Sequence, residues 1–260
     1  MTRSEIERAL DAFAKKKFIS SEHEKLVKRV ETKCTELGYM VLEMGSAVKG
    51  TAIPGSDIDL LAIIPPGKEK FNPSNSLYHL KQLLQSPFNP HPGNHSLIIK
   101  ENGLGVDVVP AKKTSTPDQY LIPSRRGNEW IKRGQDAFTN DFIKLDKKLN
   151  GRLSSAVKVL KSWNYKKTTL DLSGLSLEKI AYDALKVGDP PGNHVDTVIK
   201  CFKELKEQIV KNVKHPAGGP RLNKLSQSER ENWKKVIEKD LVKLETFERE
   251  AWSQVLGFDI

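Results

Sequence analysis

The sequence predicts an α+β N-terminal lobe, a helical C-terminal lobe and a cleft between the two. Apolar residues form short runs of strand type within residues 39–64 and again within residues 96–109. After about Asn140, apolar residues recur at helical intervals instead. Strands that come first and helices that follow favour the α+β class, so we expect one domain at residues 1–140 and a second at residues 141–260.

The N-terminal lobe is expected to begin with a helix over residues 1–36, in which Ser21-Glu22-His23-Glu24 has the spacing of a capping box. A strand then ends where Pro65 and Pro66 follow it. Glu101-Asn102-Gly103 is typical of a hairpin turn. The other predicted elements of this lobe are strands at residues 39–44, 57–64, 96–100 and 105–109 and a short helix at residues 77–84.

The C-terminal lobe is predicted from helical apolar spacing. A stripe at positions i, i+3, i+4 and i+7 is formed by Leu153, Ala156, Val157 and Leu160. Residues 214–220 contain two prolines and two glycines, the composition of a loop. Further helices are expected at residues 175–186, 195–213 and 226–256.

Composition excludes several classes of protein. Hydrophobic side chains make up 37% of the 260 residues, which is enough to bury a core. No apolar run approaches the roughly 20 residues that a membrane helix needs, and the first residues lack the apolar region of a signal peptide. Two cysteines, Cys34 and Cys201, are too few for a disulfide scaffold. We therefore expect a cytoplasmic protein without a membrane partner.

The chain is basic, with 43 Lys and Arg residues against 33 Asp and Glu residues and a formal net charge of +10. An excess of this size favours polyanionic partners such as nucleotides or nucleic acid. Surface lysines that are only solvated give the same excess, and charge alone favours that simpler interpretation.

Three aspartates indicate a metal site. Asp57 and Asp59 stand two residues apart in a predicted strand, so their side chains project from one face. Asp107 lies in a later strand, within Gly-Val-Asp-Val-Val-Pro. Carboxylates in apolar strands are costly to bury without a cation, and hard divalent metals prefer oxygen ligands. Three purely structural acids are the weaker interpretation.

A Gly-Ser pair, Gly45-Ser46, follows the first predicted strand and precedes Lys49-Gly50-Thr51. Glycine lets a ligand approach the backbone closely, and backbone N–H groups together with a serine hydroxyl can hold phosphate oxygens. The pair alone indicates only a turn. A P-loop NTPase is disfavoured, because the sequence has no Walker A motif.

Together, Gly45-Ser46, Asp57 and Asp59 after ten further residues, and Asp107 resemble the signature of the nucleotidyltransferase superfamily related to DNA polymerase β. The resemblance implies a polymerase-β-like lobe with its active site in the cleft. It implies that Gly45 and Ser46 hold the triphosphate of a nucleoside triphosphate. It also implies that the three aspartates are catalytic and bind two Mg²⁺ ions, or Mn²⁺ in their place, while a hydroxyl displaces pyrophosphate.

Residues 44–60, Met-Gly-Ser-Ala-Val-Lys-Gly-Thr-Ala-Ile-Pro-Gly-Ser-Asp-Ile-Asp-Leu, are similar to one branch of this superfamily. That branch contains 2′-5′ oligoadenylate synthetases, cyclic GMP-AMP synthase, archaeal CCA-adding enzymes and the bacterial CD-NTases. Residues 153–164 and 252–258 resemble CD-NTases in particular. This resemblance implies a signalling synthetase that makes a cyclic or linear oligonucleotide from ATP, GTP or other NTPs. It further implies a role in antiphage defence and an effector protein that binds the product.

The same resemblance points to phosphate-binding residues in the helical lobe. The family places a lysine against the triphosphate, and Lys161 matches it better than Lys158; we expect both on the polar side of their helix. Ser173 would contact the phosphates or cap its helix. The relatives stack an aromatic ring on the base, but residues 172–178 contain none. Tyr165 or Tyr182 would have to replace it.

Two other interpretations stay open. An enzyme that adds nucleotides to an RNA 3′ end would explain the charge, although archaeal CCA-adding enzymes carry further tRNA-binding domains. A catalytically silent nucleotide- or RNA-binding module is disfavoured by the three acids. A nucleic-acid activator is not favoured, because Ser124-Arg125-Arg126 and Lys166-Lys167 lack interleaved aromatic residues for base stacking.

Overall fold

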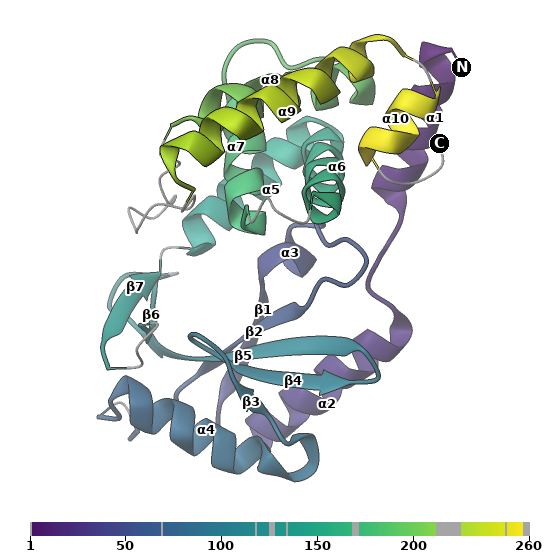
Figure 1. Ribbon diagram of the computed structural model, residues 1–260. Coiled ribbons are helices and arrows are strands. Elements are labelled where there is room, and N and C mark those ends of the chain that lie inside the picture. The colour runs from purple at the N-terminus through teal and green to yellow at the C-terminus, as the bar shows by residue number, and fades with distance from the viewer. Residues whose placement is uncertain are drawn as a thin grey trace. The chain divides into compact units, whose positions relative to one another are not determined.

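The structure is a computed structural model (Figure 1) that describes residues 2–68, 70–117, 119–124, 128–133, 135–167, 172–211, 225–247 and 249–256. It divides into two compact units. The sheet unit is Lys17–Phe138, and the helical unit combines Met1–Lys16 with Thr139–Ile260. The first helix therefore packs in the helical unit and not, as predicted, in the N-terminal lobe.

Long-range contacts explain the position of this first helix, α1 (Arg3–Lys15). Its apolar side chains Ile6 and Leu10 are completely buried. The Glu7 carboxylate accepts hydrogen bonds of 2.6 and 2.8 Å from the first two N–H groups of α8 (His194–Ile209). A carboxylate at a helix N-terminus satisfies unpaired N–H groups and interacts favourably with the helix dipole. Local sequence periodicity carries no information about this partner.

The sheet unit contains a mixed sheet. Among the described residues its strands run in the order β1–β2–β5–β4–β3, and β6 pairs with β5 and β7. The central pair β2–β5 is parallel and the other pairs are antiparallel. The elements are α2 (Ser21–Glu36), β1 (Met40–Met44), α3 (Gly45–Val48), β2 (Ile58–Ile63), α4 (Pro73–Phe88), β3 (His91–Pro92), β4 (Leu97–Glu101), β5 (Leu104–Lys113), β6 (Tyr120–Pro123) and β7 (Trp130–Arg133).

The two faces of this sheet have separate apolar clusters. Leu60 and Val108 belong to the cluster that packs against α2 and α4, which lie on one side of the sheet (Figure 1). Leu61 and Val109 belong to the cluster on the opposite face. Strands that are buried on both faces read as continuous apolar runs, which explains the unbroken Leu60–Ile64 segment. Because side chains alternate along a strand, the aspartates of β2 and β5 fall on the face opposite α2 and α4.

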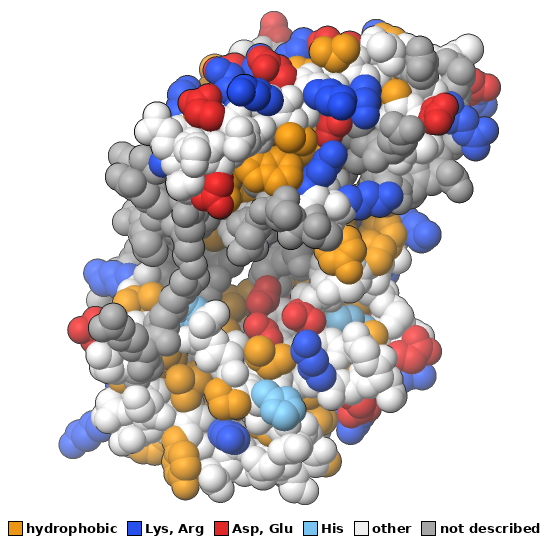
Figure 2. Space-filling view, in the orientation of Figure 1, with side chains coloured by type: hydrophobic (Ala, Val, Ile, Leu, Met, Phe, Trp, Pro, Cys, Tyr) orange, Lys and Arg blue, Asp and Glu red, His pale blue; other side chains and the backbone are white. Residues whose placement is uncertain are grey.

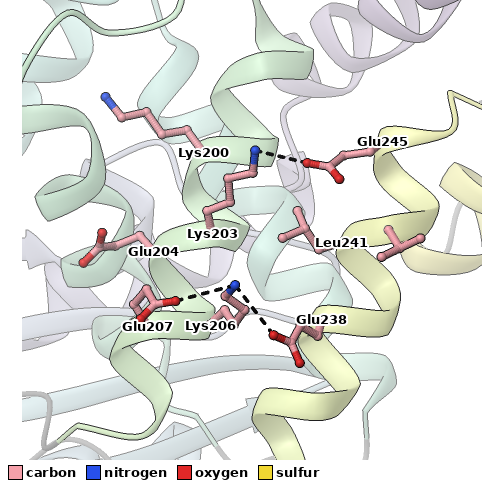
Figure 3. A pocket seen from close by; sticks show the side chains of 9 residues that line it. Lys200, Lys203, Glu204, Lys206, Glu207, Glu238, Leu241 and Glu245 are labelled. Atoms are coloured by element: carbon pink, nitrogen blue, oxygen red, sulfur yellow. Dashed lines mark ion pairs between the residues drawn. The ribbon is translucent and has the colours of Figure 1, made fainter.

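The helical unit contains α1, most of α5 (Gln135–Lys148), α6 (Arg152–Lys166), α7 (Gly174–Lys186), α8, α9 (Gln227–Glu245) and α10 (Arg249–Leu256). At its centre Trp163 of α6 is completely buried and donates its Nε1–H to Asp240 of α9 at 2.9 Å. Between α8 and α9, Lys203 pairs with Glu245 at 3.1 Å beside the apolar side chain of Leu241 (Figure 3). None of the described helices is long and apolar enough to cross a membrane.

Several predicted boundaries differ from the structure. Residues 1–36 form two helices, because the chain is extended at Lys16 and a new helix starts after Ser20. Ser20, and not Ser21, is the N-cap, and its side chain accepts the His23 N–H at 3.1 Å. The predicted helix at 226–256 is broken between α9 and α10, where Phe247 has a positive φ of 56°. Strands β6 and β7 were not predicted, and the predicted loop at 214–220 lies outside the described residues.

Candidate active site

The register of the two central strands brings the predicted acids together. In the parallel β2–β5 pair, Asp59 lies directly opposite Asp107, so the two side chains share one face of the sheet. Asp57 precedes β2 by one residue and is exposed. A Cβ atom at Gly105 of β5 would lie 1.8 Å from Asp57 Oδ1, so the Asp57 carboxylate lies beside β5 two residues before Asp107.

Two glycines make room for these carboxylates. A Cβ atom at Gly45 would overlap Asp59 Oδ2, and one at Gly105 would overlap Asp57 Oδ1. Gly45 also has a φ of +72°, a conformation that L side chains rarely adopt. Each carboxylate therefore lies directly against glycine backbone, and the Gly-Ser pair adjoins the acids in space.

The surroundings of Asp107 disfavour its ionised form. Burial, together with the nearby Asp59 and Asp57 carboxylates, raises the pKa of Asp107 to about 6. Ser96 opposes this rise by donating its hydroxyl hydrogen to Asp107 Oδ2 at 3.3 Å. The other oxygen, Oδ1, is buried and has no hydrogen-bond partner in the structure as described. Like charges in this proximity favour a cation.

This acid cluster fits a hydrated divalent metal. The described side chains do not form a ready-made group of three His, Cys, Asp or Glu ligands around one point. Mg²⁺ does not require such a group, since it usually keeps several waters and binds through one or two carboxylates and substrate phosphates. The acids suit such a cation for two reasons. Asp107 Oδ1 is buried and has no hydrogen-bond partner among the described residues, and the neighbouring carboxylates repel one another.

Ser46 lies in the single helical turn α3, directly after Gly45. Its backbone carbonyl accepts the Thr51 N–H at 2.9 Å, which closes the segment that leads back toward the acids. The side chain of Ser46 is half-buried, whereas Lys49 and Thr51 are buried. Contact between the Ser46 hydroxyl and a phosphate stays a prediction.

Lys161 and Ser173 belong to the helical unit. Contrary to the expectation of a polar helix side, Lys161 is buried, and its Nζ pairs with Glu178 Oε1 of α7 at 2.9 Å. A Cβ at Gly174 would lie only 3.4 Å from the same Nζ atom, so this amine sits beside the first turn of α7. Ser173 caps α7 by accepting the Ser176 N–H at 3.2 Å. Phosphate binding by either residue stays a prediction.

Lys158 is also buried, but it has a different role. Its Nζ donates to the carbonyl oxygens of Ala14 and Lys16 at 2.6 and 3.1 Å, at the C-terminal end of α1. Burial lowers the pKa of Lys158, an effect that Asp146 partly opposes. The preference for Lys161 over Lys158 as a phosphate ligand is consistent with this structural use of Lys158.

The two tyrosines proposed to replace a stacking aromatic differ in exposure. Tyr182 is buried, with the Lys186 ammonium over its ring at 5.3 Å. Tyr165 is 76% exposed. Of the two, only Tyr165 presents its ring to a ligand in solution.

Basic and acidic side chains are mixed on the face of the molecule shown in Figure 2, where blue side chains stand beside red ones. Arg125 and Arg126, one of the two basic clusters in the sequence, lie outside the described residues. The groove between α8 and α9 in Figure 3 is lined by both charges and contains none of the predicted site residues.

Sequence reasoning missed three residues that support the site or its units: Ser96, Glu178 and Glu7. Each acts through a partner on another element, Asp107, Lys161 and the start of α8, respectively, which lie 11, 17 and 187 residues away. Ile98 faces Asp107 across the β4–β5 pair, and Ser96 stands two residues before Ile98 on the same face. Once the hairpin register was known, this spacing was a usable signal for the contact between Ser96 and Asp107.

Comparison with known proteins identifies a matching family and similar folds. Residues 23–122 match the family described as nucleotidyltransferase domain. CdnC of E. coli MS115-1, solved with ATP, is 16% identical with a TM-score of 0.75 over 96% of this chain and 97% of that chain. The CD-NTase CdnG of Bradyrhizobium diazoefficiens, in complex with GTP, is 14% identical with a TM-score of 0.72 over 92% of this chain and 89% of that chain.

A third similar structure is the STING-associated CdnE c-di-GMP synthase of Capnocytophaga granulosa, at 18% identity and a TM-score of 0.68 over 93% of this chain and 84% of that chain. No curated protein sequence matches the chain. Residues 23–122 therefore form a nucleotidyltransferase domain. The fold of the chain, both units included, is the fold of the CD-NTases.

Proposed function

We propose that this nucleotidyltransferase joins NTPs into a cyclic or linear oligonucleotide and releases pyrophosphate. The observation that carries the proposal is the placement of Asp59 opposite Asp107 on one sheet face, with Asp57 close by and the Gly-Ser pair beside them. The similar structures solved with ATP and GTP support NTP substrates. The c-di-GMP synthase among them supports a nucleotide second messenger as the product.

In this reaction a hydroxyl oxygen of one nucleotide forms a bond to the α-phosphorus of an NTP. The bond from that phosphorus to the bridging oxygen breaks, pyrophosphate leaves with that oxygen, and the hydroxyl proton passes to solvent water. Asp57, Asp59 and Asp107 would hold the divalent cations. Mg²⁺, or Mn²⁺ in its place, supplies positive charge to the phosphates and lowers the pKa of the attacking hydroxyl. Ser46 donates its hydroxyl hydrogen to a phosphate oxygen, and Lys161 and Ser173 bind phosphate from the helical unit.

The test is incubation of the purified chain with radiolabelled NTPs and Mg²⁺, with and without tRNA. A phosphatase-resistant product that forms without RNA supports the proposal. Replacement of Asp57 and Asp59 together by Ala should abolish that product while the protein remains folded, because the change removes repulsion between like charges. Normal turnover by this double variant would refute the catalytic assignment.

The same experiment separates the two alternatives. Extension of tRNA instead of a free product indicates an RNA 3′-end nucleotidyltransferase, and no turnover under either condition indicates a silent binding module. A role in antiphage signalling through an effector protein is part of the proposal. It is tested by expressing the chain with its neighbouring genes and measuring phage plaques with the wild type and with the Asp57/Asp59 double variant.

A further inference from the structure

We propose that Ser96 is a positioning residue that orients the Asp107 carboxylate for cation binding. The inference rests on the proposed function, because it concerns how one of the cation-binding groups is held. The Ser96 side chain is buried, and its hydroxyl donates to Asp107 Oδ2 at 3.3 Å. The other carboxylate oxygen, Oδ1, has no hydrogen-bond partner within the described chain. A neutral donor thus fixes one oxygen and leaves the second for a cation.

The sheet register places Ser96 where this contact is geometrically natural. Ile98 of β4 lies directly opposite Asp107 of β5. Ser96 is two residues before Ile98, so it is the diagonal neighbour of Asp107 on the same face. A side chain at this place can reach the carboxylate without crossing the sheet, whereas Leu97 points to the opposite face and belongs to the cluster under α2 and α4.

The turn between β3 and β4 holds the hydroxyl in place. The Gly93 N–H donates to the Ser96 carbonyl oxygen at 2.8 Å, which closes the turn. The ring of His95 anchors the same turn, because its Nδ1 lies 2.7 Å from the carbonyl oxygen of Pro123. A Cβ atom at Gly93 would lie only 2.6 Å from Ser96 Oγ. Any larger residue at Gly93 therefore displaces the hydroxyl that contacts Asp107.

Groups that orient metal ligands typically change metal affinity by about 10- to 100-fold when they are removed. The affinity of the full chain for Mn²⁺ alone, measured by electron paramagnetic resonance without nucleotide, is therefore the decisive quantity. We expect Ser96→Ala to weaken Mn²⁺ binding by about tenfold. Ser96→Thr, which keeps the hydroxyl, should bind Mn²⁺ like the wild type. Gly93→Ala should weaken binding in the same direction as Ser96→Ala.

The matched control is Ser76→Ala. Ser76 is completely buried in the same unit, and its hydroxyl donates to the carbonyl oxygen of Asn72 at 2.9 Å, on α4 and its cap. Removal of this hydroxyl tests whether any buried serine of the sheet unit affects Mn²⁺ binding, and we expect no change. Circular dichroism of all variants shows that the fold is retained.

Three results would overturn the inference. Wild-type Mn²⁺ affinity in Ser96→Ala would show that the hydroxyl has no positioning role. A loss in Ser96→Thr as large as that in Ser96→Ala would show that only packing matters, and a loss in Ser76→Ala would show a general loss of structure. These results leave the proposed function intact if the wild type binds Mn²⁺ and makes product. A wild type that does neither refutes the proposed function, and the inference with it.

Discussion

Asp107 combines an unfavourable electrostatic environment with a position directly opposite Asp59 in the central parallel strand pair. It is partly buried beside two other carboxylates, and its Oδ1 atom has no partner among the described residues. Groups held in this way commonly serve a ligand rather than the fold, because the ionised form costs stability in the absence of that ligand. The native protein without metal should therefore bind a proton at Asp107 more tightly than the unfolded chain does.

Replacement of Asp107 by Asn tests this directly. Burial, and then the Asp59 and Asp57 carboxylates, raise the pKa of Asp107 to about 6 in the native protein, whereas in the unfolded chain it is about 4. The stability that protonated Asp107 contributes to the native state is therefore fully present below about pH 4 and is lost as the pH rises through 6. Asp107→Asn should thus raise the melting temperature by a few degrees at pH 7.5 in EDTA, where 1 kcal/mol corresponds to about 2–4 °C. Near pH 4 the difference should vanish. A lower melting temperature for the variant at pH 7.5 would contradict this account.

The close approach of Gly105 to Asp57 gives a second prediction at this scale. Gly105→Ala should reduce the rate of product formation by about 100-fold, because the new Cβ displaces the Asp57 carboxylate by a distance on the order of 1 Å. Gly192→Ala is the control, since no atom lies within 4 Å of a Cβ there. Initial rates of product formation at saturating NTP measure the effect of both substitutions. Similar rates for the two variants would mean that Asp57 tolerates the shift.

At the scale of elements, α6 and α7 are joined by the buried pair of Lys161 and Glu178, whose side chains are 10% and 4% exposed. Removal of one partner leaves the other charge buried and costs roughly 3–5 kcal/mol. Loss of activity in Lys161→Ala would therefore mix two effects, phosphate binding and stability. The pair must be removed as a unit to separate them.

The double variant Lys161→Met with Glu178→Leu makes this separation. It should recover most of the melting temperature that Lys161→Ala loses, because apolar side chains of similar size replace buried ion pairs well. The apparent KM for NTP should stay raised in both variants, since neither has the amine. Recovery of the KM along with the melting temperature would show that Lys161 is structural only.

The contact between α1 and α8 provides a further prediction. Glu7→Ala should lower the stability by about 1 kcal/mol, the usual value of a lost N-terminal cap. Glu238→Ala is the control, because Glu238 lies in the middle of α9 and forms an exposed ion pair with Lys206 at 3.7 Å, which contributes little. Thermal unfolding of both variants measures the difference, and equal melting temperatures would exclude a capping role for Glu7.

The sequence predicted elements well where the signal was local. The apolar runs of β2 and β5 and the stripe of α6 identified the central strands and the central helix of the helical unit. The short strands β6 and β7 have no such runs, because four residues beside a loop bury few side chains. The proximity of Asp59 and Asp107 could be predicted because acids are unusual in apolar strands. Ser96 and Glu178 were missed, since each is an ordinary residue type until the strand register or the helix packing that brings it to its partner is known.

For the whole molecule, the net charge of +10 gives a prediction about regulation. We expect synthesis rates to be nearly unchanged when RNA or duplex DNA is added at physiological salt, because a basic surface of mixed charge binds nucleic acid weakly and in a salt-sensitive way. Stimulation of tenfold or more that disappears on charge reversal of Arg125 and Arg126 would identify an activating polyanion instead.

The discontinuous make-up of the helical unit has a consequence for biosynthesis. Its first helix leaves the ribosome before the sheet unit, and its remaining helices come after residue 138. The contiguous sheet unit can complete its own contacts while translation continues at about 5–20 residues per second. During that time Ile6 and Leu10 of α1 have no core to enter, since their partners in α6 and α8 are not yet made. The core of the helical unit is therefore completed last, because α1 can be buried only after α6 and α8 have been synthesised.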